Sequence, residues 1–530
     1  MSITEESTPA ADDSVRPKPG YRRSVPVNAE VKEHCHIYLD EQIYPTALAL
    51  LNDLVVTGAA HPVHRDRPTV VPDPHHIELA CALLVHPRPT SQEAANLSLP
   101  SQSILFLRNV LINLGPRNAN LSEAFSFSLT STRKSRSSRI RYEDGSSCSD
   151  TEDKQEHVNG IIANNGRLRR CARDFWHVVG WAFNCSVRYP RRWTVWKVWL
   201  DYMLDVLEHD WTQREQEDLA EEDCWNLRRQ SLIVKYLADA VDKSYAMKRI
   251  VRSAFADANA ESLKDFPEIF PNETKKLSYG QKRKRDDPLG KMFGSYDDED
   301  EAEFESDGSS QSSQDGDENE IMSGEDWLGD MDTMALRQRV IMLLSRVSAY
   351  LPECFADCGD VYDEIYQCAV RLPLPAFTQF MSTANSSQMP SFVFVTLAQL
   401  LLIRLLPLSA PRPQTIEDRN DDGVTQLMLE RCFLPFASSN STVADNARVS
   451  ILAENFFRSL VRTGGCEYTL SLKAAVDKGI LVRENKIKGD RRKKDSDARN
   501  KAEEGDMFTL KASGQRMRCL LAALRRCSSN

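Results

Sequence analysis

The chain has 530 residues, of which 41% are hydrophobic and 27% are charged, and its formal net charge is −10. A chain of this length can form about two to four domains, while the net negative charge argues against a protein that coats nucleic acid, which needs a concentrated basic surface. Thirteen cysteines without a regular framework predict reduced intracellular thiols rather than a disulfide scaffold. Because Met1–Asp13 lacks a basic segment followed by an apolar one, we do not expect secretion.

The first helical unit is expected at residues 25–128, after a disordered tail at 1–24. Apolar residues recur there at helical spacing in three segments, Pro45–Val56, His76–Val85 and Ser101–Leu114. Gly115 and Pro116 are expected to end the third helix, because glycine and proline commonly follow a helix. Residues 129–160 carry almost no large apolar side chain and predict a disordered linker.

The second unit, residues 161–271, contains seven of the eight tryptophans. Trp196, Trp199, Met203 and Leu207 recur at intervals of three and four, which predicts an amphipathic helix with a wide apolar face. Two further helices are expected at Leu227–Ala240 and Ser244–Phe255. Residues 272–332 combine basic clusters with acidic runs and predict a second disordered linker.

The third unit is expected at residues 333–488, followed by a charged linker at 489–512 and a basic amphipathic helix at 513–527. That last helix either covers the helical core or docks on a partner. The apolar segment Ser391–Leu408 contains Arg404 and is shorter than the roughly 20 residues that span a bilayer, so we interpret it as a core helix and expect no membrane contact.

The whole pattern predicts an all-α fold, since runs of alternating apolar residues typical of strands are short or absent. We expect stacked helical hairpins, either HEAT- or TPR-like or irregular α-bundle modules, separated by disordered charged linkers.

Motifs for nucleotide binding, serine hydrolysis and zinc proteolysis are absent from the sequence, and we therefore expect a protein that is not an enzyme and needs no cofactor. Seven of the ten histidines lie between His34 and His86, with Cys35 and Cys81 nearby. A zinc site is one interpretation of this group, but the irregular spacing favours loop histidines without a metal. Cys354, Cys358 and Cys368 are interpreted as buried thiols for the same reason.

Cationic and aromatic residues alternate at Arg188, Arg191, Arg192 and Trp193, a combination that can hold single-stranded nucleic acid by stacking and phosphate pairing. The alternative is a loop at the start of a helix, with a core tryptophan and solvated arginines. Nucleic acid is therefore a possible but secondary partner.

Basic clusters in the linkers predict nuclear import, because an import receptor binds separated Lys and Arg side chains on an extended chain. The predicted import residues are Lys275, Lys276, Lys282, Arg283, Lys284, Arg285, Arg491, Arg492, Lys493 and Lys494. The neighbouring acidic runs offer candidate phosphorylation sites at Ser149, Thr151, Ser306, Ser310 and Ser313.

The resulting hypothesis is a nuclear, non-enzymatic scaffold or adaptor that binds other proteins in a chromatin or genome-maintenance complex, with an import receptor as a further partner. The alternative hypothesis is an RNA-associated ribosome-assembly factor. Fold class alone does not separate the two.

Overall fold

A computed structural model of the chain describes its helical parts. The described residues are 20–59, 67–87, 98–127, 158, 162–163, 166–220, 226–238, 243–274, 327–381, 391–416, 424–488 and 497–527. Within them the chain is almost entirely helical, and the predicted all-α class is confirmed. A repeat of HEAT or TPR type is not established and stays a prediction.

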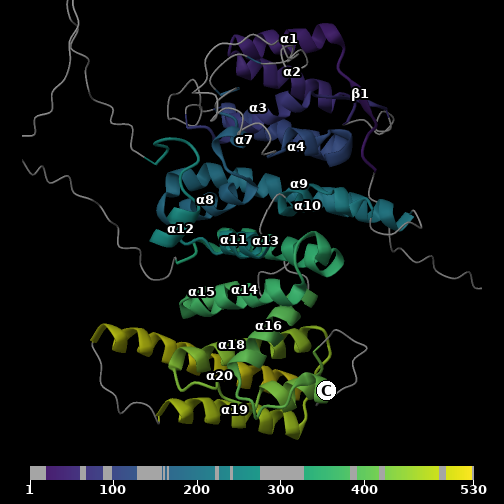
Figure 1. Cartoon of the computed structure of the whole chain (residues 1–530). Helices are drawn as coiled ribbons and strands as arrows, with labels where there is room; N and C mark the ends of the chain where they lie inside the picture. The colour runs from purple at the N-terminus through teal and green to yellow at the C-terminus, as the bar shows by residue number, and fades with distance from the viewer. Residues whose placement is uncertain are drawn as a thin grey trace, which may run out of the picture.

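The helices are stacked in layers that follow the chain, from α1 at one end to α19 and α20 at the other (Figure 1). The first elements are β1 (Ser24–Pro26), α1 (Ala29–Asp40), α2 (Tyr44–Val56), β2 (Thr69–Val71), α3 (Pro74–Val85), α4 (Leu99–Asn118), α5 (Leu121–Ala124), α7 (Leu168–Cys171), α8 (Phe175–Arg188), α9 (Pro190–Ala220), the 3₁₀ turn η2 (Arg228–Gln230), α10 (Leu232–Ala238), α11 (Lys243–Ala254) and α12 (Ala260–Asp265). The later elements are α13 (Met331–Tyr350), η3 (Pro352–Cys354), α14 (Cys358–Arg371), α15 (Leu374–Phe380), α16 (Ser391–Leu405), η4 (Pro413–Thr415), α17 (Gln426–Met428), the π-helical η5 (Leu429–Phe433), α18 (Val443–Arg462), α19 (Leu470–Lys488) and α20 (Asp497–Cys527).

One connected hydrophobic core runs through the stack, from Cys35 in α1 to Leu521 in α20. The described residues of all three predicted units contribute to it, and α4 packs on α9 while α11 packs on α14. The boundaries proposed for the units stay predictions, but the described helices of neighbouring units are in direct contact.

The first layers contain the two short strands of the described residues, β1 and β2, which pair in parallel. Arg22 fixes this ladder by donating hydrogen bonds to the carbonyl oxygens of Thr57 and Arg67, each 3.0 Å long. In α4 the helix bends at Gly115, whose φ is +72°. A side chain there would be strained, and a Cβ would also lie 2.4 Å from the ring of Tyr21.

The tryptophans form the core of the middle layers, as the periodicity predicted. Trp181, Trp196, Trp199 and Trp211 are fully buried. The indole N–H of Trp199 donates to the Cys81 sulfur across 3.0 Å, which joins α9 to α3. The indole N–H of Trp196 donates to Glu273 across 3.2 Å, so two of the four buried indoles have a polar partner and all four pack within the core.

The helix α13 connects the middle layers to the later ones. It contacts α9 and α11 as well as α14 and α15. Arg339 on α13 is bound by three carboxylates of α9, with distances of 2.8 Å to Asp201, 2.6 Å to Asp205 and 2.8 Å to Glu208. Asp201 also pairs with Arg108 of α4 at 3.2 Å, so α4, α9 and α13 share one ion-pair network.

A second arginine of α13, Arg337, is fully buried. Its guanidinium donates hydrogen bonds of 2.8 Å to the carbonyl oxygens of Ala254 and Ala256 and of 3.2 Å to that of Leu328. It also lies over the ring of Phe183 in α8, 4.2 Å from the centroid. Burial lowers the pKa of Arg337 to about 9, so the group remains protonated at neutral pH and depends on these acceptors.

The last layers pack equally closely. Gly479 of α19 lies against η5, where a Cβ would be 1.8 Å from the carbonyl oxygen of Leu434. Arg483, one turn later, donates to the carbonyl oxygens of Phe436 and Leu434. The final helix α20 begins at Asp497, earlier than the predicted start at 513, and Leu510 adds a buried apolar residue to the part of the helix before 513.

Replacing Arg337 by methionine should lower the free energy of unfolding by about 3 kcal/mol, since buried carbonyl oxygens lose their donors. The midpoint of thermal unfolding followed by circular dichroism measures this change. Arg191→Met, at an exposed arginine, is the matched control and should leave the midpoint nearly unchanged. Equal midpoints for Arg337→Met and wild type would show that the guanidinium does not support the stack.

His76 gives the fold a pH dependence. Burial lowers its pKa to about 4, with Asp73 opposing the shift and His36, Lys32 and His75 adding to it. The unfolded chain takes up this proton below about pH 6.5, while the folded chain resists until about pH 4. Stability should therefore fall by up to about 3 kcal/mol as the pH drops between these values. Urea midpoints of His76→Leu should fall less over the same range, and parallel curves would contradict this assignment.

Candidate protein-binding cleft

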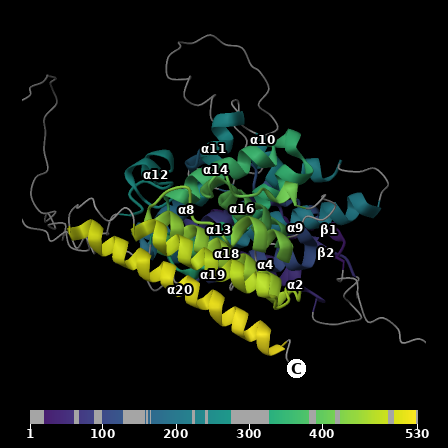
Figure 2. The same cartoon turned by 90° about the horizontal axis from the view of Figure 1, so that it is seen from below.

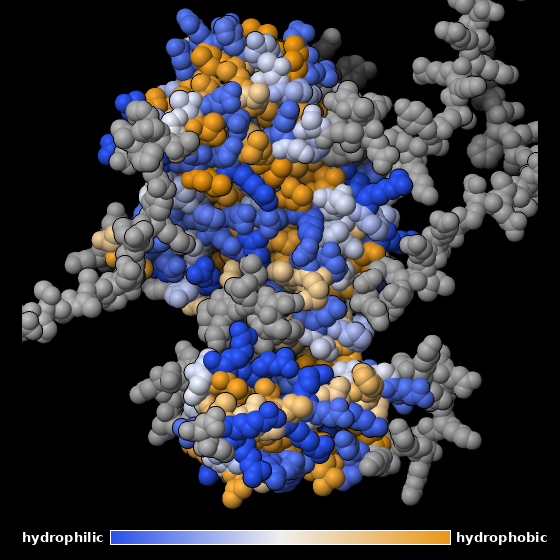
Figure 3. All heavy atoms as spheres, turned by 180° about the vertical axis from the view of Figure 1, so that it is seen from behind, coloured by the Kyte–Doolittle hydropathy of each residue, from blue (hydrophilic) through white to orange (hydrophobic). Residues whose placement is uncertain are grey.

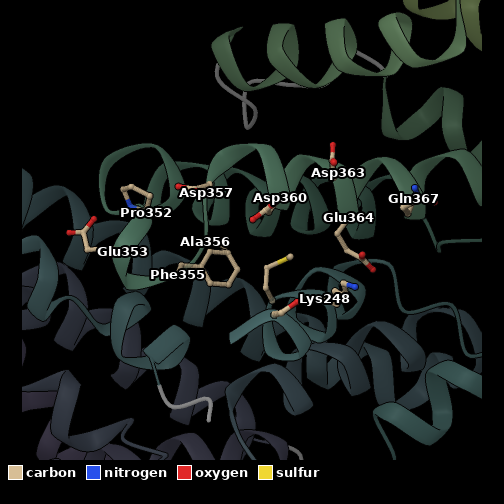
Figure 4. A pocket seen from close by; sticks show the side chains of 12 residues that line it. Lys248, Pro352, Glu353, Phe355, Ala356, Asp357, Asp360, Asp363, Glu364 and Gln367 are labelled. Atoms are coloured by element: carbon tan, nitrogen blue, oxygen red, sulfur yellow. The ribbon is translucent and has the colours of Figure 1, made fainter. Parts of the chain in front are cut away.

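An open cleft of about 800 Å³ lies between α11, η3 and the first half of α14 (Figure 4). Acidic side chains predominate around it, and apolar side chains form part of its wall. The lining residues are Ser244, Met247, Lys248, Pro352, Glu353, Phe355, Ala356, Asp357, Asp360, Asp363, Glu364 and Gln367.

The amphipathic pattern of α14 positions the acidic side of the cleft. Val361 and Ile365 are fully buried and attach the helix to the core. Asp357, Asp360 and Glu364 recur at intervals of three and four residues and therefore share one face of this helix. Asp357 and Asp360 also lie at its N-terminal end, where the helix dipole favours negative charge.

Three of the lining carboxylates are paired with arginines outside the cleft. Glu353 lies 2.6 Å from Arg229, and Glu364 lies 3.1 Å from Arg252. Asp363 pairs with Arg404 of α16, and Figure 4 shows it pointing away from the cleft. Glu364 and Asp363 thereby attach α14 to α11 and α16, and all three carboxylates contribute little free charge.

The remaining carboxylates are available to a ligand. Asp357 and Asp360 are exposed, and among the described residues no Lys or Arg lies within ion-pair distance of either one. Lys248 on α11 is the single cation among the lining residues. Met247 and Phe355 also line the cleft, and 6% and 5% of their surfaces are exposed. The cleft can therefore bind a cationic group and an apolar group side by side.

The thiols near the cleft are poorly suited to nucleophilic chemistry. Burial raises the pKa of Cys368 to about 12 and raises that of Cys358, with Asp357 adding to the second shift. The thiol form therefore dominates at neutral pH, whereas a nucleophile must be a thiolate. Among the residues that the structure describes, no group of three His, Cys, Asp or Glu side chains is placed to hold a metal ion.

The structure separates the three arginines considered for nucleic-acid contact. Arg188 and Arg191 are exposed at the corner between α8 and α9. Arg192 is buried, lies 2.6 Å from Glu273 and donates to the carbonyl oxygen of Val85. Burial raises the pKa of Glu273, and the adjacent Arg192 opposes that shift. Arg192 thus forms a buried ion pair with Glu273 and is not exposed for contact with nucleic acid.

The described histidines of the first layers are distributed over several elements. His34 and His36 lie on α1, where His36 is 3.5 Å from Asp40. His75 and His76 lie at the start of α3, and His86 follows that helix and packs edge-on against Phe270. His61 and His64 lie outside the described residues.

The predicted import residues and phosphorylation sites also lie outside the described residues.

The spacing of acidic residues in the sequence indicates one wall of the cleft, although these residues form no known motif. Acidic residues at 353, 357, 360 and 364 alternate with the buried positions of an amphipathic helix. Their spacing shows a shared acidic face, but the opposing wall comes from α11, more than 100 residues earlier in the chain. No local pattern links those two segments.

No protein-family model and no curated protein sequence matches this chain.

Across the described helices, none has both the length and the apolar content needed to cross a membrane. The helix α16, which contains most of the apolar segment Ser391–Leu408, is 15 residues long and packs on α14 and α18.

Proposed function

We propose that this protein is a non-enzymatic nuclear scaffold that binds other proteins, and that the cleft between α11 and α14 is one of its binding sites. The observation that carries this proposal is the pair of exposed, unpaired carboxylates, Asp357 and Asp360, beside the apolar surface of Met247 and Phe355. Such a surface provides both charge attraction and apolar burial.

The chemistry of the cleft suits a peptide segment that carries Lys or Arg next to an apolar anchor. The two free carboxylates attract and orient the cations, while the apolar side chain is buried against the wall. A cleft of about 800 Å³ accommodates a few side chains, so the partner contributes a short segment rather than a whole domain.

The nuclear part of the proposal rests on the basic clusters Lys282–Arg285 and Arg491–Lys494. An import receptor is their expected partner, and a chromatin or genome-maintenance complex is the expected assembly. Acidic, serine-containing runs beside these clusters supply sites at which phosphorylation would add negative charge.

Reversing the charge of the cleft should abolish its preference for basic peptides. An array of 12-residue peptides with two Lys or Arg around one Leu or Phe, probed with the full chain, should yield binders. The double variant Asp357→Lys, Asp360→Lys should weaken them at least tenfold, which is about 1.4 kcal/mol. The control Glu33→Lys, Glu41→Lys makes the same change of charge on exposed positions of the first layer.

Two outcomes would contradict the cleft proposal. One is an array without binders that contain Lys or Arg. The other is an equal loss of binding in the cleft variant and in the control, because that result would attribute the preference to total charge.

Nuclear import provides a separate prediction. Deleting Lys282–Arg285 and Arg491–Lys494 together should leave a fluorescently tagged chain in the cytoplasm. Deleting a stretch of equal length from the acidic run Asp297–Glu320 is the control and should not change the location. Nuclear signal after the double deletion would contradict the import assignment.

A second candidate function, an RNA-associated ribosome-assembly factor, is favoured by the exposed Arg188 and Arg191 beside Tyr189. Abundant RNA adducts after crosslinking in cells, reduced by Arg188→Glu with Arg191→Glu, would favour this candidate over the protein scaffold.

A further inference from the structure

The final helix α20 exposes a large aromatic side chain on the side that faces away from the fold. Leu510, Met517 and Leu521 are buried, and α20 packs along α18. Phe508 lies outside this buried stripe, and 74% of its surface is exposed. Figure 2 shows α20 along the outer edge of the last layers, and Figure 3 shows hydrophobic residues among strongly hydrophilic ones on the surface of these layers. One exposed apolar side chain is common in a monomer, and its neighbours decide whether it marks an interface.

Two residues of opposite charge lie on either side of Phe508. Glu504 precedes it by four residues and Lys511 follows it by three, so the three side chains share one side of α20. Both charged residues are exposed, and no oppositely charged group of the described residues lies within ion-pair distance of either one. The two charges are therefore available to a partner.

Small residues complete this side of the helix. Gly505 is exposed, and a Cβ at this position would meet no atom within 4 Å. Gly505, Phe508, Ala512 and Gln515 recur at intervals of three, four and three residues. This is the spacing of the seam between two paired helices. A second helix can therefore approach α20 closely on both sides of the phenylalanine.

A two-fold axis through Phe508, perpendicular to the helix, makes this surface complementary to itself. Such an axis places a second α20 antiparallel to the first and brings the two phenylalanine rings together. Glu504 lies about 6 Å before Phe508 along the helix and Lys511 about 4.5 Å after it, so each Glu504 lies opposite Lys511 of the partner subunit. Gly505 lies opposite the partner's Ala512 in the same way, which leaves room for the two rings. In a two-fold interface each of these pairs occurs twice.

The arrangement of charges selects a second copy of the chain over other partners. A polyanion would be repelled by Glu504, and a basic peptide would be repelled by Lys511, whereas an antiparallel copy meets both with opposite charge. Arg518 is already 3.8 Å from Asp477 of α19 and is not needed for the contact. We propose that two copies of this protein associate through α20, with the Phe508 rings stacked at the two-fold axis and a Glu504–Lys511 ion pair on each side.

The size of this contact sets the expected affinity. One helix from each copy buries less than the roughly 1,200 Å² at which stable interfaces begin, so the dimer is weak, with a Kd in the micromolar range.

Sedimentation velocity of the full chain measures the dimer directly, at about 1 to 100 µM, a range that brackets the affinity expected of a small interface. The wild type should shift from monomer toward dimer as its concentration rises. Phe508→Ala should weaken the dimer about tenfold or more, because the buried aromatic pair is lost.

Leu470→Ala is the matched control. Leu470 is 79% exposed on α19 and lies toward the other end of α20, because the neighbouring Tyr468 lies under the guanidinium of Arg525. Its replacement should leave dimerisation unchanged. Since Phe508 and Leu470 are both exposed, circular dichroism should show the wild-type unfolding midpoint for both variants.

Exchange of the two charges tests the pairing. Glu504→Lys alone and Lys511→Glu alone should each weaken the dimer, because each places like charges opposite one another. The double variant Glu504→Lys, Lys511→Glu should restore the wild-type affinity, since opposite charges then meet again across the axis.

Three results would overturn the proposal. The first is a wild type that remains monomeric up to about 100 µM. The second is equal dimerisation of Phe508→Ala and wild type, or a double exchange that does not restore what the single variants lose. The third is a monomeric wild type that retains a nuclear protein which Phe508→Ala loses, because this face would then serve a different partner. Asp357→Lys with Asp360→Lys should not change sedimentation, so the dimer and the cleft are tested independently.

Discussion

The buried guanidinium of Arg337 is the interaction on which the stack depends. A charge that is removed from water must be compensated inside the protein. Here the acceptors are carbonyl oxygens at the end of α11, just after it and just before α13. Two residues later, Arg339 binds three carboxylates of α9. These arginines attach α13 to the middle layers through hydrogen bonds and ion pairs, while the apolar residues of α13 belong to the common core. The geometry of hydrogen bonds and ion pairs thereby fixes the rotation of α13, which apolar packing alone specifies less strictly.

This attachment has consequences for the proposed binding sites. The cleft is formed by α14, which follows α13 directly, and by α11, whose last carbonyl oxygen accepts a hydrogen bond from Arg337. Both walls of the cleft therefore pack against the same helix, α13.

Local periodicity predicted most of the helices, because a buried stripe recurs every three to four residues wherever a helix covers a core. It predicted α2, α3 and α11 closely, and it predicted the tryptophans of α9 as core residues. It did not predict the cleft, since the walls come from separate segments. It also did not predict the roles of Arg192 and Arg337, because a buried arginine and an exposed one have the same local pattern. Their partners, Glu273 and the carbonyl oxygens near Ala254, are distant in sequence.

The central claim is that α13 joins the earlier and later layers into one cooperative unit. Native-state hydrogen exchange of the full chain, measured on peptides from α9, α13 and α14 at increasing urea concentrations, tests it directly. The account predicts that the slowest amides of these three helices converge on one opening free energy and on one dependence on urea. If α14 opened at distinctly lower free energy while α9 and α13 remained protected, the layers would be independent units and the claim would be contradicted.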